Sequence, residues 1–332
     1  MANDKTFLTY NQQMKKLRNA KKIKCNGSSN KEMLVRSGYF NIINGYKIPF
    51  TCGSDSNGNH VYYGNTSLDQ INHLKKFDES LRMVLLKHIT RIEEEVRTLT
   101  GYKFDQYNNN GKTSWYEINA YSMNCDLKSK IHTISSIFSD LKHTKSEYVD
   151  FYVNRHKQIP TWIMIKVVNF STFIDILKYS HNNVTHAICE LYSMYDGKNM
   201  PDVKLLIGSL HWLRIVRNSC AHNERIYCIN ITNSNNNRII EHYFKLLPPQ
   251  YAKSTQKNIF DILVYFKYFL PENEFKSLIE DIKKLLLKLQ LDINPNAFDN
   301  VRSTMGIKNL TDLDTLVNLP KTKIDYNKFD AM

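Results

Sequence analysis

The sequence lacks several features that would place it in a common class of enzyme. Its six cysteines include no Cys-x-x-Cys pair and no spacing matched to histidines, so the pattern indicates no zinc site. A Gly-rich phosphate loop and a spaced pair of acidic metal ligands are also missing, which disfavours nucleotidyl or phosphoryl transfer. We therefore expect a protein that uses neither a metal ion nor a cofactor.

Long apolar runs are missing as well. No run reaches the roughly 18 residues that a membrane-spanning helix needs. The N-terminal lysines are accompanied by no hydrophobic signal core. Free thiols in a reducing compartment are then the simplest explanation of the cysteines. These absences predict a cytoplasmic protein without a membrane partner.

Acidic residues are too few to balance the basic ones. The 332 residues carry 45 Lys and Arg against 32 Asp and Glu, a net charge of +13 with an isoelectric point near 9.2. Such an excess favours a polyanionic partner, although a Lys- and Asn-rich composition from A/T-biased codons would explain part of it. One basic cluster precedes the first glycine-tyrosine element and consists of Lys15, Lys16, Arg18, Lys21, Lys22 and Lys24.

Apolar residues recur at helical spacing over most of the chain, and few segments alternate as strands do. This pattern predicts an all-α fold. The longest expected helix starts at Ser67 or Asp69 and ends near Leu99. Further helices are expected at about 4–24, 31–44, 126–142, 146–155, 160–179, 184–195, 201–223, 256–269 and 272–289.

No composition shift divides the chain cleanly. We interpret residues 1–66 as a basic N-terminal helical extension and residues 67–332 as one continuous helical domain. Residues 51–66 are rich in glycine and asparagine and predict a loop, with a short extended piece at 60–63. The segment 226–245, which contains an asparagine tract, predicts a small β-hairpin insertion.

One short motif carries the groups that can cut RNA without a metal. Arg217, Asn218 and His222 fall within six residues near the end of the helix expected at 201–223. A histidine can move the protons of a reaction at a ribose 2′-hydroxyl, while a cation and an amide stabilise charge on the phosphorus oxygens. Cys220, inside the motif, is expected to pack in the helix rather than to act as a nucleophile.

The position of Arg217 supports a special role for it. An apolar stripe on the same helix is formed by Leu206, Leu210 and Leu213. Arg217 continues this stripe, which is costly for a guanidinium unless it is paired or faces a cleft. Of the three successive glutamates at 93–95, Glu93 follows an apolar position and is the candidate to brace Arg217.

The spacing of the motif also predicts a dimer. Arg217 and His222 would be about 140° apart on a regular helix, so one helix cannot bring the two side chains together. Two antiparallel copies of the helix across a two-fold axis would combine two arginines with two histidines. The alternative left open is a purely structural pair between Arg217 and a carboxylate, with His222 as a helix cap.

The Arg-Asn-x-x-x-His motif resembles the signature of HEPN ribonucleases, which are helical and metal-independent. The stretch from Leu213 to Arg225 resembles more narrowly the bacterial abortive-infection (Abi-like) family of phage-defence proteins, of the AbiD/AbiF type. Further similar stretches occur in matching order at 34–40, 45–50, 77–82, 91–97, 159–162, 168–172 and 305–306.

The resemblance implies a HEPN-like helical bundle and a toxin-like endoribonuclease, in which Arg217, Asn218 and His222 are catalytic. RNA would be the substrate, and we expect the basic cluster, together with Arg214 and Arg225 beside the motif, to contact it. We expect a bound structured RNA to restrain the activity, with an acidic protein antitoxin as the rival restraint. The competing hypothesis is a non-catalytic protein that sequesters RNA.

Overall fold

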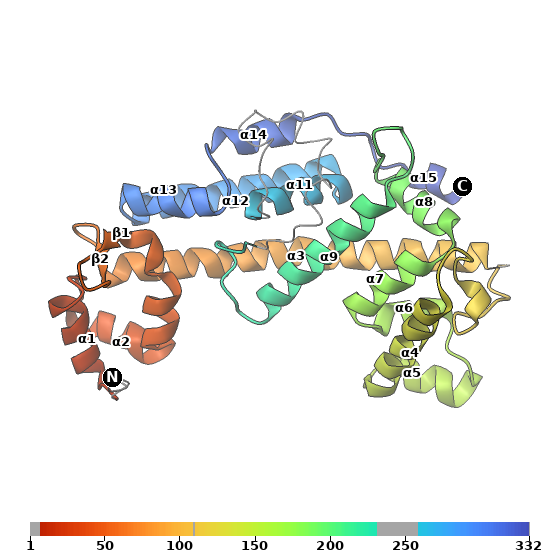
Figure 1. Ribbon diagram of the computed structural model, residues 1–332, viewed down its shortest axis with the longest axis horizontal. Helices are drawn as coiled ribbons and strands as arrows, with labels where there is room; N and C mark the ends of the chain where they lie inside the picture. The colour runs from red at the N-terminus through yellow and green to blue at the C-terminus, as the bar shows by residue number, and fades with distance from the viewer. Residues whose placement is uncertain (1–6, 109, 231–257, 332) are drawn as a thin grey trace.

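One helix of 40 residues, α3 (Leu68–Tyr107), organises the molecule. The computed structural model describes residues 7–108, 110–230 and 258–331. Within this part of the chain, α3 runs along most of the length of the molecule (Figure 1). It begins with a capping box, in which the Ser67 hydroxyl accepts from the Gln70 backbone N–H and the Gln70 side chain accepts from the Ser67 N–H.

The remaining elements are short compared with α3. Those before it are α1 (Tyr10–Asn19), α2 (Gly27–Ser37), the π-helix η1 (Phe40–Asn44), the 3-10 helix η2 (Ile48–Phe50), β1 (Thr51–Ser54) and β2 (His60–Tyr62). Those after it are η3 (Ile118–Ala120), α4 (Leu127–His143), α5 (Glu147–Phe151), η4 (Tyr152–His156), α6 (Thr161–Val167), α7 (Phe170–Tyr179), α8 (Asn182–Leu191), α9 (Val203–Ala221), α11 (Ile259–Phe269), α12 (Glu272–Asp292), α13 (Pro295–Thr304), α14 (Thr311–Asn318) and α15 (Tyr326–Ala331).

Helices from both halves of the chain pack against α3. In Figure 1, α1 and α2 lie at the left, near the N-terminal end of α3, and α4 to α8 gather around its C-terminal end at the right. α12 packs along α3 on the side opposite to α1 and α2. α9 crosses α3 between the two groups and also contacts α7 and α8. This crossing helix is the one that carries the Arg-Asn-x-x-x-His motif.

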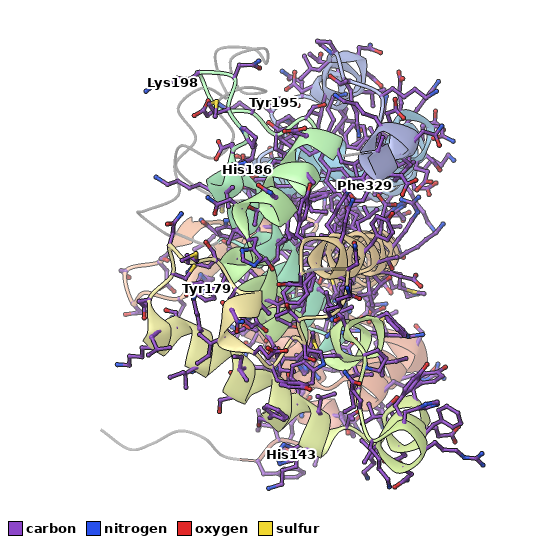
Figure 2. All side chains as sticks on the ribbon, turned by 90° about the vertical axis from the view of Figure 1, so that its right-hand side faces the viewer. His143, Tyr179, His186, Tyr195, Lys198 and Phe329 are labelled. Carbon is purple, nitrogen blue, oxygen red and sulfur yellow. The ribbon has the colours of Figure 1, made fainter. Side chains whose placement is uncertain are left out.

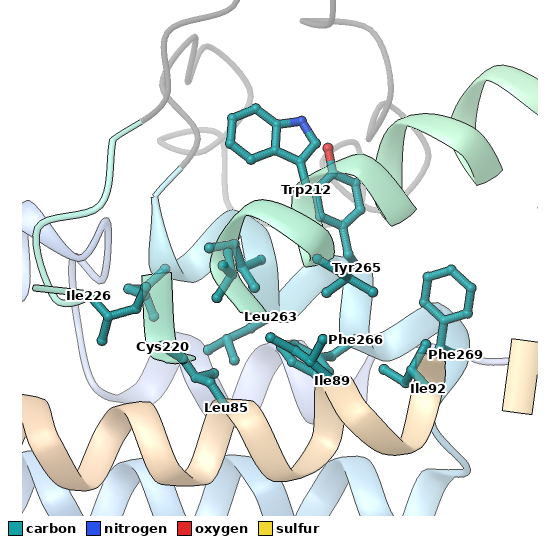
Figure 3. Close-up of a cluster of buried hydrophobic side chains, with 14 of the residues drawn as sticks. Leu85, Ile89, Ile92, Trp212, Cys220, Ile226, Leu263, Tyr265, Phe266 and Phe269 are labelled. Atoms are coloured by element: carbon teal, nitrogen blue, oxygen red, sulfur yellow. The ribbon is translucent and has the colours of Figure 1, made fainter. Parts of the chain in front are cut away.

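One part of the core lies where α9 and α11 meet α3 (Figure 3). Figure 3 shows Leu85, Ile89 and Ile92 of α3 near Phe266 of α11 and Cys220 of α9. All five side chains are buried. Each large apolar side chain buried in this way contributes about 1.5–3 kcal/mol relative to an exposed one. The motif helix is therefore held on a rigid support.

The all-α fold class is confirmed, because helices dominate the described residues and their one sheet is the antiparallel pair β1 and β2. The extended piece predicted at 60–63 corresponds to β2, whereas β1 lies in a segment that the sequence predicted as loop. The hairpin predicted at 226–245 falls largely outside the described residues. Residues 226–230 form turns and irregular chain.

The prediction of one helix at 160–179 is wrong, because this segment forms two helices. α6 ends at Val167 and α7 begins at Phe170. Asn169 caps α7 by accepting the Thr172 backbone N–H at 2.9 Å. The Asn169 side chain also donates to Asp140 of α4 at 2.8 Å. A tertiary contact therefore stabilises the break. The helices α13, α14 and α15 were not predicted.

The C-terminal helix α15 returns to α3. Phe329, labelled in Figure 2, packs beside α3 with its ring centroid 4.7 Å from Lys103 Nζ. The Tyr326 hydroxyl donates to Glu95 Oε1 at 3.0 Å. These contacts fix the end of the chain to the central helix. None of the helices in the described ranges is both long and apolar enough to cross a bilayer.

Candidate active site

The motif helix α9 forms where the sequence predicts it. Asp202 is the N-cap, and its carboxylate accepts the Leu205 backbone N–H at 2.9 Å. The stripe of Leu206, Leu210 and Leu213 is fully buried. α9 ends at Ala221, so His222 is the C-cap, and its backbone N–H donates to the Asn218 carbonyl at 2.9 Å. The motif therefore occupies the last turn of the helix.

Arg217 is held by a carboxylate of α3. Its Nε lies 3.7 Å from Glu93 Oε2, and its side chain keeps 40 % of its exposure. Its Nη1 donates to the side-chain oxygen of Asn218 at 3.4 Å. The prediction that Glu93 braces Arg217 is confirmed. Because the ion pair is long and Arg217 is partly exposed, the guanidinium remains accessible to an anion.

Glu93 is itself fixed by a second arginine of α3. Arg97 Nη2 lies 2.7 Å from Glu93 Oε1. Arg97 Nη1 donates to the carbonyl oxygens of Ile165 at 2.6 Å and Val168 at 2.9 Å. Its guanidinium carbon lies 4.9 Å from the centroid of the Phe173 ring. Burial lowers the pKa of Arg97, and the charge of Glu93 opposes this shift. We call Glu93, Arg97 and Arg217 the arginine network.

His222 opens into a different part of the molecule. Its side chain is exposed and lines a cleft of about 880 Å³ between the end of α9, the start of α3 and the segment from α2 to η1. The cleft residues are Arg36, Ser37, Phe40, Asn41, Asn44, Gly45, Tyr46, Lys75, Glu79, Arg82, His222, Asn223, Glu224, Arg225 and Cys228. Basic side chains outnumber acidic ones in this lining, which suits a phosphate-containing ligand.

A buried carboxylate holds the turn that follows His222. Asp78 has no exposed side-chain surface, and its Oδ2 lies 2.7 Å from Arg82 Nη1. The Tyr46 hydroxyl donates to the same oxygen at 2.9 Å. The backbone N–H groups of Ile226 and Tyr227 donate to Oδ1 at 3.1 and 2.7 Å. We call Asp78, these donors and Arg82 the aspartate network.

Two further contacts complete the aspartate network's hold on the turn. Arg82 Nη1 also donates to the Glu224 carbonyl at 3.2 Å. Arg225 Nη1 donates to the Gly45 carbonyl at 2.7 Å. The glycine-tyrosine element, the start of α3 and the end of the motif stretch therefore meet at one place. Burial raises the pKa of Asp78, although hydrogen bonds from Tyr227 and Tyr46 and the charge of Arg82 oppose the rise.

The structure places Arg217 and His222 apart within one copy of the chain. Arg217 points to Glu93, whereas His222 lines the cleft beside Arg82. Among the described residues, no hydrogen bond or ion pair joins the two side chains. Both features of the structural alternative, the Arg217–carboxylate pair and the His222 cap, are also present. Geometry within one copy therefore leaves both hypotheses standing.

Cys220 packs as the sequence predicts. It is buried on α9, and burial raises the pKa of its thiol to about 12. A thiol with such a pKa is protonated near neutral pH and is a poor nucleophile. In the described part of the chain, no group of three or more His, Cys, Asp or Glu side chains could hold a metal ion.

The basic cluster lies on and just after α1. Lys15, Lys16 and Lys22 are exposed. Lys21 is half-buried, and its pKa is lowered by burial and by the nearby charges of Lys47 and Lys16. Arg18 Nη1 donates to the Cys25 carbonyl at 3.0 Å, and Lys24 Nζ donates to Asn65 Oδ1 at 2.6 Å. Lys21 Nζ lies 6.0 Å from the centroid of the Tyr62 ring.

The two arginines predicted beside the motif differ from each other. Arg214 is half-buried on α9, and its Nε has no hydrogen-bond partner among the described residues. Arg225 is exposed and tethers Gly45. Arg225 therefore lies in the cleft with His222, whereas Arg214 is absent from the cleft lining.

Sequence reasoning assigned no role to Asp78, Arg82 or Arg36, which the structure brings to the cleft or beneath it. One signal for the first two was present. Asp78 and Arg82 are four residues apart on a helix whose neighbouring positions are apolar, and this spacing favours an ion pair on the buried face. Arg36 has a similar partner in Glu32, four residues before it, but both side chains of that pair are exposed.

A model of the Abi-like protein family matches residues 32–228, which is more than half of the 332-residue chain. No curated protein and no solved structure matches the chain. The matched region starts just before the α2 wall of the cleft and ends at Cys228, the last residue of its lining. Both networks lie inside it.

Proposed function

The chain belongs to the Abi-like protein family, and from this premise we propose that it is a metal-independent endoribonuclease. Its activity would act in abortive infection, as a toxin that stops phage propagation. We place it with the AbiD/AbiF type and with the HEPN ribonucleases, on the resemblance of its motif. One observation carries the proposal: the Arg-Asn-x-x-x-His motif ends α9 at the mouth of a cleft rich in basic side chains.

The proposed reaction is attack by a ribose 2′-hydroxyl on the adjacent phosphorus. A bond forms between phosphorus and the 2′ oxygen while the bond to the 5′ oxygen breaks. One proton leaves the 2′-hydroxyl and one is given to the 5′ oxygen, so the products are a cyclic phosphate and a 5′-hydroxyl. His222 would transfer protons, Arg217 would stabilise the pentacoordinate phosphorus, and Asn218 would orient a phosphate oxygen or His222.

We propose further that the active site is shared between two copies of the chain. The reaction needs a base and an acid, whereas the motif of one copy supplies a single histidine. Arg217 and His222 also point to different networks within one copy. A homodimer with the C-terminal ends of two α9 helices side by side would supply two histidines and two arginines.

RNA cleavage in the presence of EDTA tests the proposed reaction. We expect cleavage with cyclic phosphate ends, and we expect Arg217→Ala and His222→Ala to abolish it. A mixed dimer of the two variants tests the shared site: its one intact arginine and its one intact histidine lie on different copies, so any cleavage above that of either variant alone must combine residues of both copies. A strictly monomeric protein with full activity would exclude the dimer.

The second candidate function is RNA sequestration without cleavage. It is favoured by the ion pair between Arg217 and Glu93 and by the cap position of His222, which give both residues structural roles. A protein that binds RNA tightly, cleaves none in EDTA and still protects cells from phage would support this function instead.

We propose that a structured RNA restrains the enzyme before infection. The cleft and the basic cluster offer a basic surface that such an RNA can occupy without being cut. The test is the ratio of absorbance at 260 and 280 nm after low-salt and high-salt purification, followed by sequencing of co-eluting RNA. A nucleic-acid-free protein at low salt that its host tolerates would point to a protein antitoxin.

A further inference from the structure

One tryptophan of this chain is exposed beside the arginine network. Trp162 retains 60 % of its exposure, whereas Trp115 and Trp212 retain 3 % and 2 %. Trp162 lies in the first turn of α6, directly after the segment that enters this helix through Pro160. Exposing a large aromatic ring to water is energetically unfavourable, and exposed aromatic rings are common at binding surfaces.

Trp162 and a second exposed aromatic side chain line one pocket. Tyr102 of α3 is 50 % exposed, and the pocket of about 410 Å³ lies between α3 and α6. This volume is within the range of small-ligand sites. Gly101, also in the lining, lies where the two helices approach closely, because a Cβ there would come within 3.3 Å of Ile165.

The pocket is also lined by two carboxylates, of which one is paired with arginines and the other is unpaired among the described residues. Both oxygens of Glu93 are engaged, by Arg97 and by Arg217. Glu94 is exposed in the same lining, and its side chain has no hydrogen-bond or ion-pair partner within the described part of the chain. A free carboxylate accepts hydrogen bonds and donates none near neutral pH. It therefore favours a ligand that presents hydrogen-bond donors on the edge facing it.

We propose that this pocket binds an unpaired guanine base of the RNA substrate, stacked on Trp162 with its Watson–Crick edge toward Glu94. Unpaired RNA bases are recognised by stacking on aromatic rings and by hydrogen bonds to this edge. Guanine alone among the four bases presents two adjacent N–H donors there, which one carboxylate can accept together. Adenine and cytosine place an acceptor beside their amino group, and uracil has one N–H between two carbonyls.

This inference rests on the proposed ribonuclease function and adds a substrate preference to it. Glu93 lines the pocket and also lies 3.7 Å from Arg217. A guanine in the pocket would therefore lie on one side of Glu93 while the proposed catalytic arginine lies on the other. The pocket would position a nucleotide close to the scissile phosphate and so define which linkages are cut.

Nucleoside binding tests the pocket without any cleavage. Guanosine, adenosine, cytidine and uridine are titrated into the full-length protein, and tryptophan fluorescence is followed with correction for nucleoside absorbance. Because Trp115 and Trp212 are buried, quenching reports Trp162. We expect guanosine to quench at the lowest concentration. Glu94→Gln should reduce the preference for guanosine about ten- to a hundredfold. Quenching that persists in Trp162→Ala would come from another tryptophan and would contradict the pocket.

Mapping of cleavage sites provides the second measurement. We expect the wild-type protein to cut at a fixed position relative to guanine, and Trp162→Ala to lose this preference while Trp162→Phe, which keeps an aromatic ring, retains it. If RNA is cut without a guanine preference and guanosine does not quench, the inference is wrong and the ribonuclease function stands. If no RNA is cut, the function is wrong, and nucleoside binding alone decides the pocket.

A third outcome also overturns the inference. If guanosine leaves the fluorescence unchanged and Trp162→Ala instead dissociates a dimer, the exposed rings belong to an interface between copies of the chain. Sedimentation of wild-type and Trp162→Ala protein distinguishes this case.

Discussion

The aspartate network and the arginine network are electrostatic opposites on the same helix. In the first, a buried carboxylate, Asp78, is surrounded by donors. In the second, a buried guanidinium, Arg97, is surrounded by acceptors and aromatic rings. The two centres are about 20 residues apart on α3, or about 30 Å. The arginine network contacts the last turn of α9 through Arg217, and the aspartate network holds the chain that follows this turn.

The aspartate network holds a stretch of backbone, whereas the arginine network holds a single side chain of α9. Asp78 accepts backbone N–H groups at 226 and 227, and Arg82 binds the backbone of Glu224, so the path of the chain after His222 is fixed. The arginine network reaches α9 through one side chain, Arg217, at 3.7 Å. Removal of the aspartate network should therefore unfold the turn, whereas removal of the arginine network should mainly change the position and charge environment of Arg217.

The largest expected effect comes from the motif side chains that the networks position. His222→Ala should reduce RNA cleavage by about 10²–10⁴-fold, the usual range for a group that transfers a proton. Arg217→Ala should reduce it by about 10²–10³-fold, the usual range for a group that stabilises transition-state charge. Thermal stability should stay unchanged in both. His143→Ala, which removes an exposed histidine on α4, is the control and should cleave normally. Wild-type cleavage by both motif variants would show that neither residue is catalytic.

A large loss of stability should follow from the loss of the central carboxylate. Asp78→Asn leaves the guanidinium of Arg82 buried without its partner, and breaking a buried pair costs about 3–5 kcal/mol. Urea unfolding measures this loss. Tyr46→Phe removes only one neutral donor and should cost about 1 kcal/mol. Equal stability of wild type and Asp78→Asn would contradict the structural role of the aspartate network.

The basic cluster lies at the same end of the molecule as the aspartate network, and salt dependence tests it. Lys15, Lys16, Lys21 and Lys22 are replaced with glutamine, and the affinity for RNA is measured at several salt concentrations. The slope of log affinity against log salt concentration should become less steep by about 3, so the loss of affinity between 50 and 200 mM salt should be ~50-fold smaller than in the wild type.

The control for the basic cluster removes the same number of charges at the other end. Lys128, Lys142, Lys145 and Lys157 are exposed on or near α4 and α5. Glutamine at these four positions should leave the salt slope close to that of the wild type. An equal change in both variants would show that RNA binding depends on net charge rather than on the cluster.

A smaller stability effect is expected at the arginine network. Glu93→Gln removes the carboxylate from Arg97 but leaves the Ile165 and Val168 carbonyls in place, so a loss of about 1–3 kcal/mol is expected. Cleavage should fall as well, because Arg217 loses its brace. Glu94→Gln, the neighbouring exposed position, should change stability by less than about 0.5 kcal/mol. If Glu93→Gln lost more unfolding free energy than Asp78→Asn, the arginine network would matter more for stability than the aspartate network.

The smallest effect is the pH dependence of the aspartate network. Because burial raises the pKa of Asp78 in the folded state, the folded protein binds this proton more tightly than the unfolded chain. Asp78 then contributes stability at low pH. This contribution is lost as the pH rises from about 4, the pKa of an aspartate in the unfolded chain, through the raised pKa of the folded state. The difference in unfolding free energy between wild type and Asp78→Asn should therefore fall with rising pH over that window.

An opposite slope in this difference would mean that the donors around Asp78 outweigh its burial. The arginine network supplies the contrast, because Arg97 stays charged at every pH at which the protein is folded.

Local pattern predicted the helices well where the apolar period is long. α9, its buried stripe and the brace at Glu93 all follow from residues close in the sequence or from one costly arginine on an apolar face. The break between α6 and α7 was missed, because Asn169 can lie within a helix or cap one. Its contact with Asp140 of α4, 29 residues away, settles which occurs.

The sequence by itself determined the all-α class, the motif helix and the groups available for chemistry, since these depend on residue type and on a helical period of a few residues. Only the tertiary structure decided where those groups point. Asp78 meets the Ile226 backbone across 148 residues of chain, and Trp162 reaches the surface next to Glu93. Such contacts depend on how helices cross, which no local spacing encodes. For that reason the sequence supplied the motif residues and their separation on one helix, and the fold decided that Arg217 meets Glu93 while His222 lines the cleft.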